Sequence, residues 1–158
     1  MEVELKHKII MVFGRICSGK SQYRIKDKVG RTYVSNIVRA LVESSDRDKL
    51  QNSMHLDDQI AKKILEGPEL MEHTEEIIID GIRQVSIVNK ILEVYPDAEM
   101  IWLEVPVEER KRRYEARGAA KDIEPFEVAD NKPIELECQN IFSTFKDKLT
   151  IINNYGIN

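Results

Sequence analysis

The segment Gly14-Arg15-Ile16-Cys17-Ser18-Gly19-Lys20-Ser21 fits the phosphate-binding pattern G-x-x-x-x-G-K-[S/T]. It follows the apolar run Ile9–Phe13 and precedes a stretch from Gln22 to Val29 that can form a helix, with Gly30 as its end. A strand, a glycine-rich loop and a helix in this order are the setting that the pattern requires. This feature constrains the chain to an α/β fold with a phosphate-binding loop.

The spacing of the loop has a physical reason. Glycines at both ends let the backbone curl around a phosphate, so that successive N–H groups and the positive end of a helix face the anion. Residues 14–21 and the following Gln22 are therefore the expected nucleotide-binding residues. Lys20 is expected to reach the β- and γ-phosphates, and Ser21 to ligate Mg²⁺.

Apolar runs alternate with helical patterns along the rest of the chain, which indicates βαβ units and a parallel sheet. The predicted strands are 8–13, 31–35, 76–80, 100–105 and 149–153. The predicted helices are 46–52, 57–66 before Gly67-Pro68, 84–94, 107–117 and 133–148. With no linker or repeat in 158 residues, we expect a single domain over 1–158.

Composition excludes several classes of protein. No run approaches the roughly 20 apolar residues of a membrane span, and the acidic first residues are unlike a secretory signal, so we expect a cytoplasmic protein without membrane contact. Cys17 and Cys138 offer no disulfide framework, and the three histidines show no metal-ligand spacing. A net charge of −4 argues weakly against a protein coated in nucleic acid.

A second segment with chemical meaning is Asp80-Gly81-Ile82-Arg83, which follows a buried strand. An acid at the carboxyl end of a parallel strand lies at the edge of the sheet where ligands bind. Asp80 could hold Mg²⁺ through water or accept a proton from an attacking hydroxyl group, and Arg83 could bind an anionic acceptor. Capping the next helix is an alternative role for Asp80 and is compatible with these.

A third segment is rich in arginine. On a helix, Arg110, Arg113 and Arg117 share one face, whereas Arg112 points elsewhere. Phosphoryl transfer needs positive charge over the transferring group, and arginines supply it while a flap excludes water. The polar segment 118–132 that follows is the expected flap, or lid. A solvated charged helix followed by an ordinary surface loop is the alternative.

Weaker candidates for the acceptor side are Arg39, Arg47 and Gln51, which lie on or near predicted helices. Isolated arginines are mostly surface residues, so each is as easily explained without a ligand.

Together these segments resemble the small P-loop kinases related to nucleoside and deoxynucleoside monophosphate kinases and to dephospho-coenzyme A kinase. The resemblance rests on Gly14–Ser21, on Asp80–Arg83 and on Arg110-x-x-Arg113-x-x-x-Arg117. Arg47-x-x-Leu50-Gln51 is similar to a short stretch of phage-type deoxynucleotide kinases. Residues 151–156 resemble the last core strand and turn of these kinases, which lie beside the adenine and would place Asn153 there.

The resemblance implies a three-layer α/β fold whose mostly parallel five-stranded sheet is ordered 2-3-1-4-5. It also implies a kinase that uses ATP and Mg²⁺ and acts on a nucleotide-type acceptor, a deoxynucleoside monophosphate. In that role Arg113 and Arg117 would stabilise the transferring phosphoryl group, and Arg110 and Arg83 would bind the acceptor. Kinases of this group that act on a hydroxyl often have an aspartate near the end of strand two, and 31–35 has none. This departure lowers the support for a dephospho-coenzyme A kinase.

Two alternatives remain open from the sequence. One is a kinase acting on the hydroxyl of 5-hydroxymethyluracil in DNA, with Asp80 as the base. The other is a regulatory module that binds a nucleotide without catalysis. A monomer and a homodimer are both compatible with the sequence.

Overall fold

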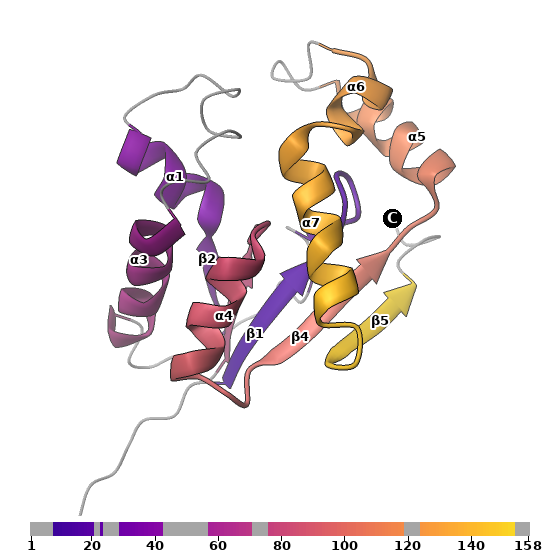
Figure 1. Cartoon of the computed structure of the whole chain (residues 1–158). Helices are drawn as coiled ribbons and strands as arrows, with labels where there is room; N and C mark the ends of the chain where they lie inside the picture. The colour runs from indigo at the N-terminus through magenta and orange to yellow at the C-terminus, as the bar shows by residue number, and fades with distance from the viewer. Residues whose placement is uncertain are drawn as a thin grey trace, which may run out of the picture.

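The computed structural model describes residues 8–20, 23, 29–42, 57–70, 76–118 and 124–153. Five strands form one sheet, and helices alternate with them along the chain (Figure 1). The strands are β1 Lys8–Phe13, β2 Val29–Tyr33, β3 Glu76–Asp80, β4 Glu99–Glu104 and β5 Leu149–Asn153. The helices are α1 Val34–Val42, α3 Asp57–Leu70, α4 Val85–Val94, α5 Val107–Arg117, α6 Phe126–Asp130 and α7 Pro133–Thr144.

The strands are ordered β2-β3-β1-β4-β5, and every neighbouring pair is parallel. The register places Val12 beside Asp80 and Phe13 beside Trp102, so β1, β3 and β4 end at one edge of the sheet. Helices α5 and α6 lie beyond this edge (Figure 1). The predicted α/β class, the five strands and their order are confirmed.

The central strands are almost wholly apolar because both faces of the sheet are covered. One face carries Met11, Phe13 and Trp102, against which helices α1, α3, α4 and α7 bury their apolar side chains. The opposite face carries a second buried cluster, formed by Ile10, Val12, Ile78, Ile101 and Leu103. Close packing on both faces holds the strand ends rigidly, and the loops after β1 and β3 leave from those ends.

The prediction around the second strand was wrong by two residues. Val29 and Gly30 belong to β2, so Gly30 does not end a helix there. Val34 and Ser35, predicted as strand, begin helix α1. Val34 and Val38 are both buried, and their spacing of four residues places them on one face of that helix. The predicted helix 46–52 lies outside the described residues.

Other parts of the prediction also differ from the structure. Strand β4 spans Glu99–Glu104 instead of 100–105, and helix α4 begins at Val85 instead of 84. Helix α3 continues through Gly67 and Pro68 to Leu70, although the proline has no N–H to donate to the Ile64 carbonyl oxygen. Helix α7 stops at Thr144 instead of Lys148, since a turn is needed there to bring the chain into β5. The predicted flap 118–132 contains helix α6, whose Phe126 and Ala129 are buried.

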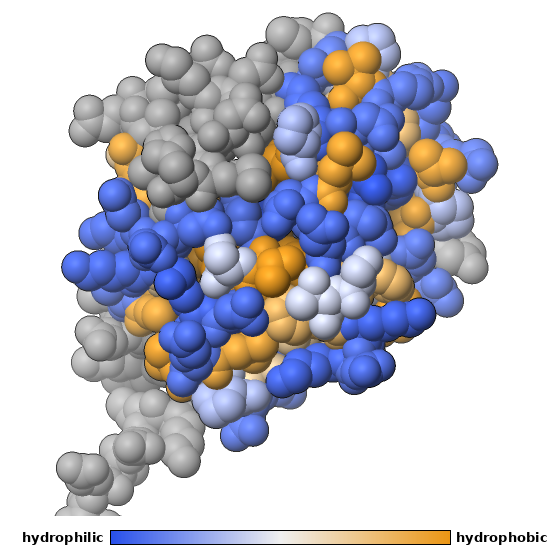
Figure 2. Space-filling view, in the orientation of Figure 1, coloured by the Kyte–Doolittle hydropathy of each residue, from blue (hydrophilic) through white to orange (hydrophobic). Residues whose placement is uncertain are grey.

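The molecular face formed by α3, α4 and α7 is mostly hydrophilic, and apolar residues show on it in separate patches (Figure 2). Within the described ranges, no helix has the length and apolar character needed to cross a bilayer.

Candidate functional site

The predicted phosphate loop leaves the carboxyl end of β1 and turns sharply. The backbone of Cys17 has a φ of 64° and that of Gly19 a φ of 93°, both in the left-handed region. The Ser18 N–H donates a hydrogen bond to the Arg15 carbonyl, 3.2 Å away, which closes a turn. A Cβ at Gly14 would lie 2.2 Å from the Ser18 hydroxyl oxygen, so only glycine fits there. The loop therefore has the tight curl that a phosphate-binding loop needs.

Lys20 lies across this loop. Its Nζ donates hydrogen bonds to the carbonyl oxygens of Gly14 at 2.9 Å and Arg15 at 3.1 Å. The pKa of Lys20 is lowered, because burial desolvates the ammonium group and because the Arg83 cation is nearby; Glu135 and Asp80 oppose this effect. The structure thus brings Lys20 together with the Asp80–Arg83 turn.

Asp80 is buried at the carboxyl end of β3, and its Oδ2 accepts a hydrogen bond from Arg31 Nη1 at 3.3 Å. The chain turns directly after it, at Gly81, where a φ of 102° favours glycine. Gln84 takes the N-cap position of α4, so the alternative that Asp80 caps this helix is wrong. From the same turn, Arg83 reaches Glu135.

Arg31 is a site residue that sequence reasoning missed. Its Nη1 also donates to the Lys20 carbonyl oxygen at 3.0 Å, and its Nη2 donates to that of Tyr23. Its side chain is only 10% exposed, so this charge belongs to the interior beside Asp80. The available signal was a charged residue inside a predicted buried strand.

The arginines predicted to share one face of helix α5 have different surroundings in the structure. Arg113 Nη1 donates to the Cys17 carbonyl oxygen of the loop at 3.3 Å, and its Nε pairs with Glu109 at 2.8 Å. Arg112 is exposed and pairs with the same carboxylate. Hydrogen bonds from Arg112 and Arg113 lower the pKa of Glu109 to about 2. Arg117 is exposed and lies over the Tyr114 ring, 5.3 Å from its centre.

Arg110, predicted to bind substrate, is buried inside the protein. Its Nη1 pairs with Asp130 Oδ1 at 2.6 Å and donates to the Ile16 carbonyl oxygen at 3.4 Å, while its Nε donates to that of Val105. Asp130 Oδ1 also forms an ion pair with Arg15 Nη2 of the loop, at 3.1 Å. The pair therefore ties α5 and α6 to the phosphate loop, and a contact between Arg110 and a substrate stays a prediction.

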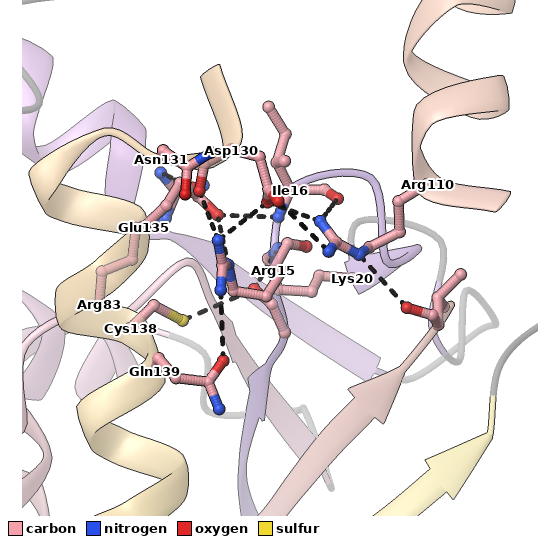
Figure 3. A network of polar contacts seen from close by, with 12 residues as sticks. Arg15, Ile16, Lys20, Arg83, Arg110, Asp130, Asn131, Glu135, Cys138 and Gln139 are labelled. Carbon is pink, nitrogen blue, oxygen red and sulfur yellow. Dashed lines mark hydrogen bonds and ion pairs between the residues drawn. The ribbon is translucent and has the colours of Figure 1, made fainter. Parts of the chain in front are cut away.

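One side of helix α7 contacts the phosphate loop. The sequence pattern did not lead us to expect this contact. Glu135 Oε1 accepts a hydrogen bond from the Ile16 N–H at 2.8 Å. The Cys138 thiol donates to the Gly14 carbonyl oxygen at 3.6 Å, and Arg15 Nη1 donates to the Gln139 side chain at 3.4 Å. Figure 3 shows this network. The spacing of residues 135, 138 and 139 puts them on one helix face, which is the signal that could have found them.

Among the remaining predicted site residues, Asn153 is described with its side chain, and it stands apart from this network. Asn153 lies exposed at the carboxyl end of β5, two strands from β1. Arg39 belongs to α1, and its side chain is outside the described part of the structure. Ser21, Gln22, Arg47 and Gln51 lie outside the described residues.

The described residues fit a phosphate group. They fit a metal ion that arrives with a nucleotide better than one that the protein holds by itself. The curled loop leaves no space for a Cβ at Gly14, and a poorly solvated lysine lies across it. Among the described residues no group of three or more His, Cys, Asp or Glu side chains could hold a metal ion. Mg²⁺ commonly binds through one or two protein oxygens together with substrate phosphates. A role of Asp80 as such a ligand stays a prediction, and its Oδ2 pairs with Arg31 in this structure.

Comparison with known proteins supports the fold. No protein-family model matches the sequence, and no curated protein matches it. A chain from the Pnkp1/Rnl/Hen1 RNA repair complex is similar, with a TM-score of 0.62, 18% identity and 90% of this chain covered. This chain spans 47% of that one. Shikimate kinase from Bacteroides thetaiotaomicron is also similar, with a TM-score of 0.55, 12% identity, and coverage of 93% of this chain and 86% of that one. The chain has the fold of the P-loop kinases.

Proposed function

We propose that this protein is an ATP- and Mg²⁺-dependent kinase that transfers the γ-phosphoryl group of ATP to a nucleotide-type acceptor, a deoxynucleoside monophosphate. The observation that carries the proposal is the convergence of three separate segments. Lys20 spans the phosphate loop, Arg113 of α5 reaches the same loop, and the Asp80–Arg83 turn lies beside Lys20. A P-loop kinase fold with these groups at the carboxyl edge of its sheet is suited to phosphoryl transfer.

On the donor side, the loop amides and Lys20 would hold the phosphates, and Ser21 and Asp80 would hold the metal. Bound Mg²⁺ would neutralise charge that develops on the phosphate oxygens. The lowered pKa of Lys20 reflects an ammonium group that has lost hydration, so an arriving anion restores the interaction that burial removed. Arg113 would add positive charge over the transferring group, and Arg117 would do so from the end of α5.

On the acceptor side lie two arginines, each paired with a buried carboxylate. Arg31 lies 3.3 Å from Asp80, and Arg83, which emerges from the turn that follows, pairs with Glu135. The remaining N–H donors of a guanidinium group suit an acceptor that is already an anion, such as a phosphate monoester, since it needs alignment more than a base. Arg39, Arg47 and Gln51 stay proposed contacts on this side.

The proposal is tested by incubating the protein with γ-labelled ATP and Mg²⁺ against a panel of acceptors. The panel contains deoxynucleoside monophosphates, ribonucleoside monophosphates, dephospho-coenzyme A and DNA carrying 5-hydroxymethyluracil. We expect label in a deoxynucleoside diphosphate. Lys20→Ala should lower turnover by at least about 100-fold while the circular dichroism spectrum is unchanged.

Arg113→Ala and Arg112→Ala form a matched pair in this assay. Both arginines contact Glu109, but the hydrogen bond from Arg113 Nη1 reaches the phosphate loop while the Arg112 side chain is exposed. Only Arg113→Ala should lower the turnover number. Label in DNA alone would replace the proposed acceptor with a modified base, and ATP binding without transfer to any acceptor would refute the kinase.

A further inference from the structure

Glu135 is a buried acid to which the proposed function assigns no role. It lies in the first turn of α7 and is only 2% exposed. A buried carboxylate is costly unless charged or hydrogen-bonding partners compensate it. Its partners therefore explain why it is there.

One oxygen of this carboxylate faces the phosphate loop. Glu135 Oε1 accepts the Ile16 N–H at 2.8 Å and lies 3.8 Å from the Nε of Arg15. That Nε is buried and has no hydrogen-bond partner, so the nearby negative charge is what compensates it. The carboxylate thus holds the backbone and a side chain of the loop.

The other oxygen faces the acceptor side. Glu135 Oε2 pairs with Arg83 Nη1 at 2.9 Å. Within the described part of the chain, Glu135 is the acidic residue with which Arg83 forms an ion pair. A guanidinium group has five N–H donors, so a single contact orients Arg83 and leaves other donors for a ligand. The Arg83 side chain is 25% exposed, which leaves it accessible.

Helix α7 holds Glu135 in a fixed position between these two sides. Ile134 and Ile141 of the same helix are buried, and Cys138 contacts the loop one turn further on. Figure 3 shows Glu135 and Arg15 among the contacts that join α7 to the loop. A side chain anchored in this way can set the distance between two groups that do not touch each other.

We infer that Glu135 is a positioning residue that sets Arg83 relative to the phosphate loop, so that an anionic acceptor is aligned with the transferring phosphoryl group. The inference rests on the proposed function and adds a residue to it. Small errors in alignment cost much of the rate of a transfer reaction, so the effect of Glu135 acts through Arg83 on acceptor use.

The informative substitution is Glu135→Gln. Its amide oxygen can still accept the Ile16 N–H, but it removes the charge that holds Arg83. We expect kcat/KM for the best acceptor of the panel to fall about tenfold, typical of coupled contacts. Mg·ATP affinity should fall by a smaller factor, because Arg15 keeps its pair with Asp130. Glu137→Gln is the control, because it removes a charge from the same helix at a residue whose partner is Asn140.

A double-substitution cycle separates positioning from a structural role. Arg83→Ala should lower kcat/KM for the acceptor by itself, and Glu135→Gln added to it should cause no further loss. Additive losses, or no effect of Arg83→Ala, would overturn the inference. An increase in acceptor affinity in Glu135→Gln would also overturn it, since Glu135 would then mask Arg83.

A binding measurement keeps the test independent of turnover. Inorganic phosphate is titrated into the complex of each variant with Mg²⁺ and a non-hydrolysable ATP analogue, which occupies the γ-phosphate position, and binding is followed by calorimetry. We expect its dissociation constant to rise about tenfold in Glu135→Gln and in Arg83→Ala, and by the same amount in the double variant. If no acceptor is phosphorylated but this pattern holds, the proposed function fails and the positioning role stands. If transfer occurs but the pattern is absent from both readouts, only the positioning role fails.

Discussion

At the level of single residues, the buried pair of Arg110 and Asp130 joins three parts of the molecule. We predict that Asp130→Ala lowers the free energy of unfolding by about 3–5 kcal/mol, because it leaves the Arg110 guanidinium buried without its carboxylate. Urea unfolding at neutral pH measures this difference. The loss should exceed that of any single contact on the outer side of α5.

Arg112→Ala is the control for that experiment. Its partner is Glu109, but the Arg112 side chain is 62% exposed, so solvent screens the pair. We expect a change of at most about 1 kcal/mol. Equal effects of the two substitutions would show that Arg110 and Asp130 do not form a buried pair in solution.

At the level of elements, helix α3 contains a glycine in its last turn. Gly67→Ala should gain less than the ~0.5–1 kcal/mol that this change usually adds to the free energy of unfolding in a helix, because the Cδ of Pro68 crowds a Cβ on the helical residue before it. The added Cβ would lie 3.4 Å from the Thr32 hydroxyl oxygen, which is an ordinary contact. Thermal unfolding without nucleotide measures the gain. A gain of the full size would show that Pro68 does not crowd this position in solution.

Gly14→Ala is the contrasting substitution. There the Cβ would lie 2.2 Å from the Ser18 hydroxyl oxygen and 3.0 Å from the Leu103 carbonyl oxygen, so the loop must change shape. We expect this variant to lose nucleotide binding, which Gly67→Ala retains.

At the level of the whole molecule, nucleotide binding should stabilise the fold. A ligand that binds only the folded state at 100 times its dissociation constant adds about 2.7 kcal/mol to the free energy of unfolding. We predict a matching rise in melting temperature with Mg·ATP for the natural chain. Lys20→Ala should show a much smaller rise at the same concentration, and differential scanning fluorimetry measures both. An equal rise in the two proteins would show that ATP binds elsewhere.

Much of the architecture follows from local sequence patterns. Three strands have the bounds that their apolar runs predict, and the parallel order 2-3-1-4-5 agrees with the family resemblance. The phosphate loop can be recognised in the sequence because its glycines and its lysine all lie within eight residues at the required spacing. The predicted secondary structure is wrong where tertiary packing overrides local preference. Val34 was predicted as strand, but it begins helix α1 and is buried in the core.

The candidate site can be predicted only in part from local sequence patterns. Asp80 ends β3, and Arg83 and Lys20 lie in the segments that follow β3 and β1, so the pairing of these two strands brings the three residues to one edge. Arg31 was missed because its contact with Asp80 joins residues 49 positions apart. Arg110 and Arg113 share a predicted helix face, but the position of α6 determines that one is buried while the other reaches the loop.

The sequence by itself determined that this chain forms an α/β sheet with a tightly curled loop of the phosphate-binding pattern after its first strand, because those features depend on neighbouring residues. Only the tertiary structure decided which side chains hold that loop and orient the groups around it. Ile16 and Glu135 are 119 residues apart, and no local pattern encodes a hydrogen bond between them. Such contacts arise from how helices pack on the sheet, since packing brings distant residues close enough for their charges and hydrogen bonds to interact.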